Sequence, residues 1–448
     1  MKRLASAGVA LAIGFCAAGA RTAHAWGTAH TEITRHAFRS LPSTDRAEAR
    51  LGGIRLMEDY CWGADYQGDV NATYYVDDYL LFPGFTNYSS HLMPEVSSTW
   101  KPFFQRTLQA LRGESPQNAA RWMGALLHFV QDSGSPPHAY PQTGGLHTRM
   151  ENFIYNYEIR LLDYQPRELG RSEEAALDGL NQRMEALVAF SRARGEKLAP
   201  LAAADARTAS EPLTLECAKE TMRVVADVAH TLLRLSESGP RPGTGALRGT
   251  LTAPIMPEFP QAPTRVLIEG TPYGTVADAA SRLPGDTEYR GTFVLGDLPP
   301  GKYQLTLMRT GCKTFRKKVS VKRGQSQELK LRLEPDTSQG NLVRNPDFSV
   351  HWLRSNAPDG WSRSGSDWVS APIRVVPGEI YELGAFTDKT KRTVGVRLSD
   401  DPHMPGTSEQ KELFGQNRLQ PTTQFVQLVI KGDAEPSYAF ARPVPRKR

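Results

Sequence analysis

The sequence predicts a multidomain protein in which an all-α N-terminal domain precedes two all-β sandwich domains. The chain has 448 residues, more than one ordinary domain requires. Apolar residues recur at spacings of three and four up to about residue 237, which is typical of amphipathic helices. Beyond residue 246 they alternate with polar residues between turn signals, as in short strands. With 40% hydrophobic and 23% charged residues, the composition excludes a disordered chain.

The first 25 residues have the pattern of a secretory signal peptide. The start MKR is basic, an apolar stretch covers residues 4–20, and AHA at residues 23–25 is an A-x-A cleavage site. The apolar stretch is too short and too rich in small residues for a membrane span. We therefore expect a secreted protein that is cleaved after Ala25, with Trp26 as its first mature residue.

Residues 26–237 form the predicted helical domain. Ser115 is a predicted N-cap with Pro116 at the first helical position, and this helix ends at Gly134, before two prolines. Another helix begins at LHTRMENF (146–153). Two further helices are expected over 172–194 and 214–235, where apolar residues recur every three to four positions.

Two predicted β-domains follow a Pro/Gly/Ser-rich linker at residues 238–246. In residues 247–335, the phrase GTFVLGDLPPGKYQLTL resembles transthyretin-like, carboxypeptidase-regulatory-type sandwich domains. Residues 341–448 open with NLVRNPDFSVHW, which resembles jelly-roll modules that often bind carbohydrate. We expect these domains to bind a glycan or another cell-surface ligand, or to act as rigid spacers.

Net charge and cysteine content leave alternatives open. A net charge of +6 favours anionic partners such as phospholipid surfaces or nucleic acid, but it is equally consistent with a solvated basic surface. Export would leave Cys61, Cys217 and Cys312. An oxidising compartment permits one disulfide, for which Cys61 and Cys217 are the favoured pair. The alternative is three buried thiols.

Histidines and carboxylates at helical spacing predict a metal site. His128 and Asp132 are four residues apart in a predicted helix, so they project from one face of it. His147 and Glu151 repeat this spacing in the next helix, and His138 lies between the two pairs. Imidazole nitrogens and carboxylate oxygens are common zinc ligands, and zinc needs three or four that converge. One such pair is usually a surface hydrogen bond, but two pairs with a histidine between them indicate a metal site.

The phrases LLHFVQDSGSPPHA (126–139) and LHTRMENF (146–153) resemble the signature of the bacterial zinc-dependent phospholipase C family, whose superfamily includes fungal single-strand nucleases. The resemblance extends to the mature N-terminal tryptophan, to GADY at residues 63–66 and to SSH at residues 89–91. It covers residues 26–235, and it is specific because the elements agree in order and spacing.

The resemblance implies three zinc ions and a ligand set for each. These sets are His91, His128 and Asp132, with Asp65 nearby; His138, His147 and Glu151; and His30, the second oxygen of Asp132, and the free amino group and carbonyl of Trp26. The third set would require cleavage before Trp26, because an amide nitrogen is a poor ligand.

This sequence departs from the family pattern in two places. Trp26 and His30 are only four residues apart, a spacing closer to that of the nucleases. His36 is an alternative ligand, but it lies about 240° around the same predicted helix from His30, so the two cannot serve one site. We prefer His30. The loop between His138 and His147 is also shorter than usual, which leaves the rim of the pocket uncertain.

Activity and substrate follow from the same resemblance. Asp65 is the candidate general base. Tyr66 and Tyr88 lie at positions where aromatic residues flank the headgroup site and would attract choline by cation–π interaction, with Glu32 as a candidate acidic partner. We therefore expect a monomeric phospholipase C acting on phosphatidylcholine-like lipids at a membrane surface. The alternatives are a zinc-dependent single-strand nuclease or nucleotidase, and a non-catalytic binding protein with a structural metal site.

Overall fold

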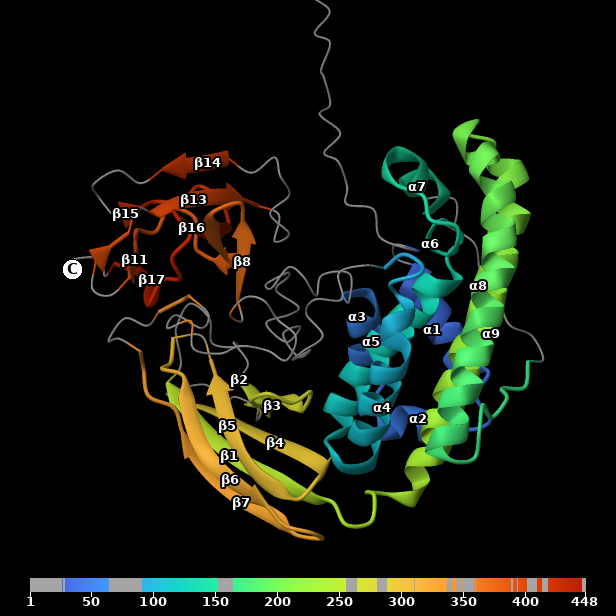
Figure 1. The fold of residues 1–448 in the computed structure, drawn as a ribbon, viewed down its shortest axis with the longest axis horizontal. Coiled ribbons are helices and arrows are strands. Elements are labelled where there is room, and N and C mark those ends of the chain that lie inside the picture. Colours follow the sequence, from blue (N-terminus) through green and yellow to red (C-terminus); the bar gives the residue numbers. More distant parts are fainter. Residues whose placement is uncertain are drawn as a thin grey trace, which may run out of the picture.

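The computed structural model describes residues 26, 29–63, 91–151, 164–254, 264–279, 288–309, 311–336, 341–343, 348, 358, 360–387, 390–392, 394–400, 409–412 and 418–444. Helices fill the described chain up to residue 238 and strands fill it from residue 245 onward (Figure 1). The predicted order of an all-α part followed by all-β parts is therefore confirmed. No described helix has the length and apolar character that a membrane span requires.

The helical part consists of a set of shorter helices packed beside a long hairpin (Figure 1). The elements are α1 (Ala29–Arg39), α2 (Thr44–Arg50), α3 (Arg55–Gly63), α4 (Ser97–Gly113), α5 (Pro116–Gly134), α6 (Pro136–Ala139), α7 (Gly144–Glu151), α8 (Glu173–Ala203), α9 (Arg207–Leu235) and the 3₁₀ turn η4 (Ser236–Ser238).

Helix α5 is the centre of this domain. Ser115 caps it by accepting a hydrogen bond from the Asn118 amide at 3.2 Å, and Pro116 occupies the first helical position, as predicted. Every residue from Asn118 to Gly134 is buried, because α5 packs against α3, α4, α8 and α9. A polar side chain in the second half of α5 is therefore enclosed by protein on all sides.

The hairpin helices are longer than predicted. Ser172 caps α8 by accepting from the Ala175 amide at 3.2 Å, and α8 continues to Ala203. Helix α9 begins at Arg207, ahead of the predicted start. Pro200 lies inside α8 and Pro212 lies inside α9. A proline in a sequence favours a helix boundary near it, but here tertiary packing lets both helices continue past the proline.

Of the two alternatives that the sequence leaves open for the cysteines, the structure supports three buried thiols and not a Cys61–Cys217 disulfide. Cys61, Cys217 and Cys312 are buried thiols that form no disulfide in the described structure. Burial raises the pKa of Cys217 to about 12 and that of Cys312 to about 11, so these two thiols stay protonated. Cys61 contacts the Thr34 hydroxyl and the Gln131 amide, each at 3.2 Å.

The first β-domain is one strongly curved seven-stranded sheet in the order β6-β5-β2-β3-β4-β1-β7 (Figure 1). Its strands are β1 (Gly245–Pro254), β2 (Thr264–Ile268), β3 (Gly274–Ala279), β4 (Glu288–Leu298), β5 (Gly301–Met308), β6 (Phe315–Val321) and β7 (Ser326–Arg332). Neighbouring strands are antiparallel except β1 and β7, which are parallel. Buried residues alternate with partly or fully exposed ones along β1, as the alternation of apolar and polar residues in the sequence predicts for a strand.

This sheet packs directly on the helical domain through β3 and β4. A Cβ atom at Gly296 would collide with the backbone carbonyl of Gly113 at the end of α4, so the two chains meet at backbone distance. Buried Arg106 of α4 forms an ion pair with Glu114 at 2.9 Å and donates to the Gly274 carbonyl at 2.8 Å. Burial raises the pKa of Glu114, and Arg106 opposes this change.

The C-terminal domain contains two further sheets with a shared core. The strands are β8 (Trp361–Ser364), β9 (Asp367–Ser370), β10 (Ile373–Arg374), β11 (Tyr381–Thr387), β12 (Thr390–Lys391), β13 (Val394–Ser399), β14 (Glu409–Glu412), β15 (Arg418–Leu419), β16 (Phe425–Ile430) and β17 (Tyr438–Pro443). One sheet has the order β14-β13-β16-β9-β8 with β10 beside β16, and the other contains β12, β11, β15 and β17.

Candidate metal centre

Two groups of side chains have the composition and spacing to hold a metal ion, and both lie near the C-terminal end of α5. The first group is His30, His128 and Asp132, and the second is His138, His147 and Glu151. Within each group, one ligand atom per residue lies within 4.8 Å of the others.

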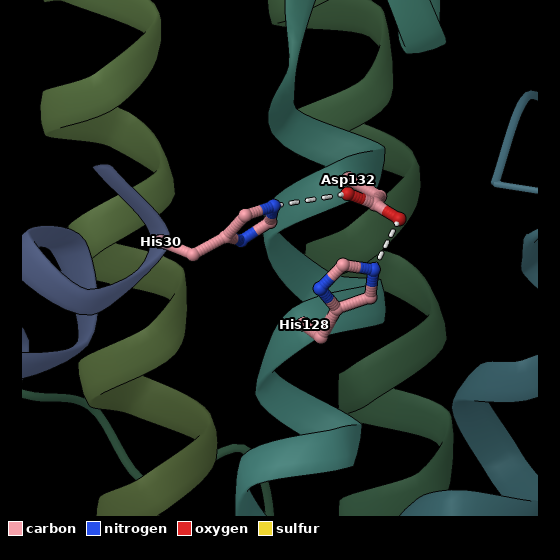
Figure 2. A group of neighbouring side chains, drawn as sticks. All are labelled: His30, His128 and Asp132. Carbon is pink, nitrogen blue, oxygen red and sulfur yellow. Dashed lines mark ion pairs between the residues drawn. The ribbon is translucent and has the colours of Figure 1, made fainter. Parts of the chain in front are cut away.

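Asp132 occupies the centre of the first group, where its two oxygens face different histidines. Oδ2 lies 3.0 Å from Nε2 of His128, one turn earlier on α5. Oδ1 lies 3.6 Å from Nε2 of His30 on α1. Figure 2 shows the two imidazoles approaching the carboxylate from different sides. All three side chains are fully buried. One carboxylate can therefore serve two adjacent metal positions.

The second group is centred on Glu151 at the end of α7. Its Oε1 lies 3.1 Å from Nε2 of His138 and 2.6 Å from Nε2 of His147. His138 is on the short helix α6, which begins at the prolines that end α5. The pair His147–Glu151 has the i,i+4 geometry predicted from the sequence.

His91 connects the two groups. Its Nδ1 lies 2.5 Å from Asp132 Oδ2 and 2.9 Å from His128 Nε2, so three candidate ligand atoms converge there. Its backbone carbonyl accepts a hydrogen bond from His138 Nδ1 at 2.7 Å. The set His91, His128 and Asp132 implied by the family resemblance is thus brought together.

Hydrogen bonds to Nδ1 fix the tautomer of the other four histidines. Because each partner is an oxygen that can only accept, Nδ1 carries a proton, and the neutral form of each ring presents the lone pair of Nε2. The partners are the Gln131 side-chain oxygen for His30 (2.8 Å) and the backbone carbonyls of Cys61 for His128 (2.7 Å), His91 for His138 (2.7 Å) and Gln142 for His147 (3.0 Å).

This arrangement fits bound cations. Each Nε2 lone pair faces a carboxylate oxygen, and two lone pairs repel unless a positive charge lies between them. Four adjacent imidazolium ions, three of them buried, would be a costly source of that charge, whereas a metal ion supplies it directly. Moreover, Asp132 Oδ1 is buried and accepts no hydrogen bond from any described residue. Imidazole nitrogen and carboxylate oxygen are donors that zinc commonly binds.

The pKa values agree with a cation site. Burial works to raise the pKa of Asp132, but His128, His91 and His138 lower it well below the ordinary range. Burial likewise raises the pKa of Glu151, and without a metal ion the protonated rings of His138 and His147 donate to it and lower its pKa overall. Both carboxylates are therefore ionised. Burial lowers the pKa of His138, while Asp132 and Glu151 raise it to a net increase.

On α1, the structure separates His30 from its alternative. His30 is buried and faces Asp132, whereas His36 is paired with Glu32 at 3.4 Å on another side of the helix. Glu32 also forms an ion pair with Arg35 at 2.9 Å, so Glu32 is engaged away from the metal ligands. Burial lowers the pKa of His36.

Trp26 lies beside the first group. Its indole donates to the Gln131 carbonyl at 2.8 Å, and its own carbonyl accepts from the Ala29 amide at 2.8 Å. The predicted residues Asp65, Tyr66 and Tyr88 lie outside the described residues. Sequence reasoning missed Gln131, because a glutamine beside a ligand has no spacing signal of its own.

Comparisons with known proteins give fold-level similarities. A PEGA domain model matches residues 293–337, which include β5, β6 and β7. The sequence matches no curated protein at a significant level.

Two solved alpha-toxin structures are similar to this chain. The alpha-toxin of an avian strain of Clostridium perfringens is 13% identical, with a TM-score of 0.36, covering 67% of this chain and 99% of the toxin. The alpha-toxin of Clostridium absonum is 14% identical, with a TM-score of 0.36 and coverage of 67% and 95%. At these TM-scores a similarity carries no argument about activity, so the function depends on the residues of this chain.

Proposed function

We propose that this protein is a secreted zinc-dependent phosphodiesterase of the phospholipase C type, active as a monomer. The observation that carries the proposal is Asp132, whose two oxygens face His30 and His128 from within a fully buried cluster. Such a shared carboxylate supports metal ions close enough together to bind one phosphate group, which is what phosphodiester hydrolysis needs.

The chain's own residues prepare the site for this chemistry. Asp132 and Glu151 are held ionised, and the histidines present Nε2 because their Nδ1 protons are donated elsewhere. Zinc bound there would supply a nucleophilic water at neutral pH and neutralise charge on the phosphate. Asp65 would accept the proton of the attacking water as general base.

Zinc binding at the third position would depend on cleavage of the signal peptide during export. Its ligands would be His30, the second oxygen of Asp132, and the amino group and carbonyl of Trp26, which becomes the first residue after cleavage behind Ala25. Elemental analysis of the exported protein should give three zinc ions per chain. A variant that keeps one extra residue before Trp26 should give two, and three in both forms would refute this scheme.

Phosphatidylcholine-like lipids are the proposed substrates. Glu151 supports this class, since the nuclease relatives tend to carry aspartate as the last ligand. Tyr66 and Tyr88 would contact the choline group by cation–π interaction. Purified protein should release phosphocholine from phosphatidylcholine and leave single-stranded DNA intact. Robust nucleotide release without lipid cleavage would replace this proposal with a zinc nuclease, the second candidate, which the close spacing of Trp26 and His30 supports.

A non-catalytic binding protein is the remaining candidate, and Asp65→Asn distinguishes it. If Asp65 is the general base, Asp65→Asn should lower kcat by a factor of about 100 or more, roughly the contribution of general-base catalysis. Zinc content should not fall to zero, because the other ligands remain. A wild-type protein with full zinc content and no activity on either substrate would favour the binding protein.

The first β-domain is the proposed contact with an anionic membrane surface. Its edge strands and the turn between them carry exposed basic residues that form no ion pair within the described chain, namely Lys317, Lys318, Lys322, Arg323 and Lys330. Vesicles containing phosphatidylglycerol should bind the protein, and K317E/K318E should weaken binding. The same charge change in K101E/K219E on the helical domain is the control, and an equal loss of vesicle binding in both variants would refute the proposed membrane contact.

The C-terminal domain is the proposed glycan-binding module.

A further inference from the structure

Gln131 lies on α5 directly before Asp132, and its side chain is fully buried. Its side-chain oxygen Oε1 is 2.8 Å from His30 Nδ1. Its amide Nε2 donates to the Thr34 hydroxyl at 2.7 Å and contacts Cys61 Sγ at 3.2 Å. The donors and acceptors of one buried side chain are thus matched to residues of α1 and α3.

The contact with His30 determines which ring nitrogen faces Asp132. Because Gln131 Oε1 can only accept, His30 carries its proton on Nδ1. The lone pair of His30 Nε2 is then directed at Asp132 Oδ1, 3.6 Å away. A neutral histidine without this acceptor could hold its proton on either nitrogen, and a protonated Nε2 cannot bind a metal ion.

Thr34 and Cys61 support this orientation of Gln131. Thr34 Oγ1 accepts from the Gln131 amide while donating to Cys61 Sγ, and this arrangement leaves Oε1 of Gln131 to face His30. Thr34 is one turn after His30 on α1. The side chain of Gln131 therefore links two successive turns of α1 to α5.

The backbone of Gln131 contacts the other predicted ligand from the N-terminal segment. Its carbonyl accepts the indole N–H of Trp26 at 2.8 Å, and Trp26 is 2% exposed. Trp26 and His30 are thus both attached to the residue next to Asp132. No contact of Gln131 with His138, His147 or Glu151 is present among the described residues, so its effect is confined to one side of the site.

We propose that Gln131 is the positioning residue of the third metal position: it sets the tautomer of His30 with its side chain and places Trp26 with its carbonyl. This inference rests on the proposed function. It predicts that loss of the Gln131 side chain selectively weakens the metal held by His30, while the metals held by His91, His128, His138 and His147 remain.

The test compares two substitutions of Gln131 with a matched control. Gln131→Met has nearly the same volume but lacks the acceptor, and Gln131→Glu keeps an acceptor for His30. Gln109→Met removes another buried glutamine, which donates to the Gly296 carbonyl at 3.1 Å far from the ligands. Each protein is exported from the complete sequence and dialysed against buffers of defined free zinc. Bound zinc is then measured by elemental analysis, and unfolding of the metal-free forms is followed by circular dichroism.

The expected result is three zinc ions for wild type and Gln109→Met, and two for Gln131→Met at the lowest free zinc. The affinity for the third ion should fall roughly 10- to 100-fold, as for other residues that orient metal ligands. Gln131→Glu should restore most of it.

Unchanged third-ion affinity in Gln131→Met would overturn the inference. An equal loss of all three ions, with a matching fall in metal-free stability, would also overturn it, because Gln131 would then act only through folding. A wild-type protein that binds no zinc would instead refute the proposed function, and the inference with it.

Discussion

Asp132→Asn should remove two zinc ions, whereas Glu151→Gln should remove one. The difference follows from geometry, because Asp132 presents Oδ2 to His128 and Oδ1 to His30, while Glu151 uses one oxygen for both its histidines. Each change replaces an ionised oxygen with a neutral amide of the same shape. The zinc content should therefore fall from three to one in the first variant and from three to two in the second.

Stability should follow the same ratio. At a free zinc concentration of about 100 times Kd, each occupied site contributes about 2.7 kcal/mol to the free energy of unfolding. Two lost sites then remove about 5 kcal/mol and one removes about 3 kcal/mol. For a domain of this size, 1 kcal/mol shifts Tm by about 2–4 °C. The helical domain should lose about 10–20 °C in Asp132→Asn and about 5–10 °C in Glu151→Gln.

Calorimetry with elemental analysis of the same samples is the appropriate assay, and EDTA provides the control. Burial raises the pKa of Asp132, but His128, His91 and His138 lower it overall, so the ionised carboxylate also stabilises the metal-free protein. The Tm difference between wild type and Asp132→Asn should therefore shrink in EDTA by the part that the zinc ions contribute. If the two variants lose equal amounts of zinc, or if EDTA leaves the Tm difference unchanged, the shared-carboxylate geometry does not operate in solution.

Two further predictions concern stability away from the metals. Gly296→Ala should destabilise the contact between α4 and β4 by about 3 kcal/mol and expose the linker at 239–244 to protease, since its Cβ would collide with the Gly113 backbone. Gly145→Ala, whose Cβ meets nothing within 4 Å, should have no such effect. Burial raises the pKa of Glu220, but hydrogen bonds from Arg223 and Arg183 lower it overall. The ionised Glu220 therefore stabilises the fold above the ordinary glutamate pKa, and this contribution is lost as the pH falls through the lowered pKa. Glu220→Gln should therefore cost about 1 kcal/mol at pH 7 and nothing at the acidic end of a urea titration, and a pH-independent difference would contradict this.

Local features of the fold could be predicted from the sequence. The start of α5 at Pro116 follows from a cap and a proline that are adjacent in the chain. The pairs His128–Asp132 and His147–Glu151 depend only on the helical period. The change from helices to strands follows equally from periodicity. In each case the determining residues lie within one turn or one strand of each other.

Features that depend on distant segments could not be predicted in this way. The Gln131–His30 contact joins residues on different helices, and no spacing or motif in the sequence marks this glutamine. The His91 carbonyl that orients His138 is a backbone group, which every residue possesses. The close approach of Gly113 and Gly296 requires the relative placement of two domains. The state of the cysteines stayed open for the same reason, since nothing in the sequence fixes the distance between Cys61 and Cys217.

Helix α5 explains how these local and distant features combine. At its N-terminal end, the capping hydroxyl of Ser115 also donates to Asp278 of β3 at 2.9 Å, and Arg121 pairs with the same aspartate at 3.0 Å. At its C-terminal end lie His128 and Asp132. One continuous buried helix therefore joins the β-domain contact to the metal ligands, and its side chains cannot shift independently in a close-packed interior. The contacts with the first β-domain therefore hold the N-terminal end of α5, opposite the end that carries the ligands.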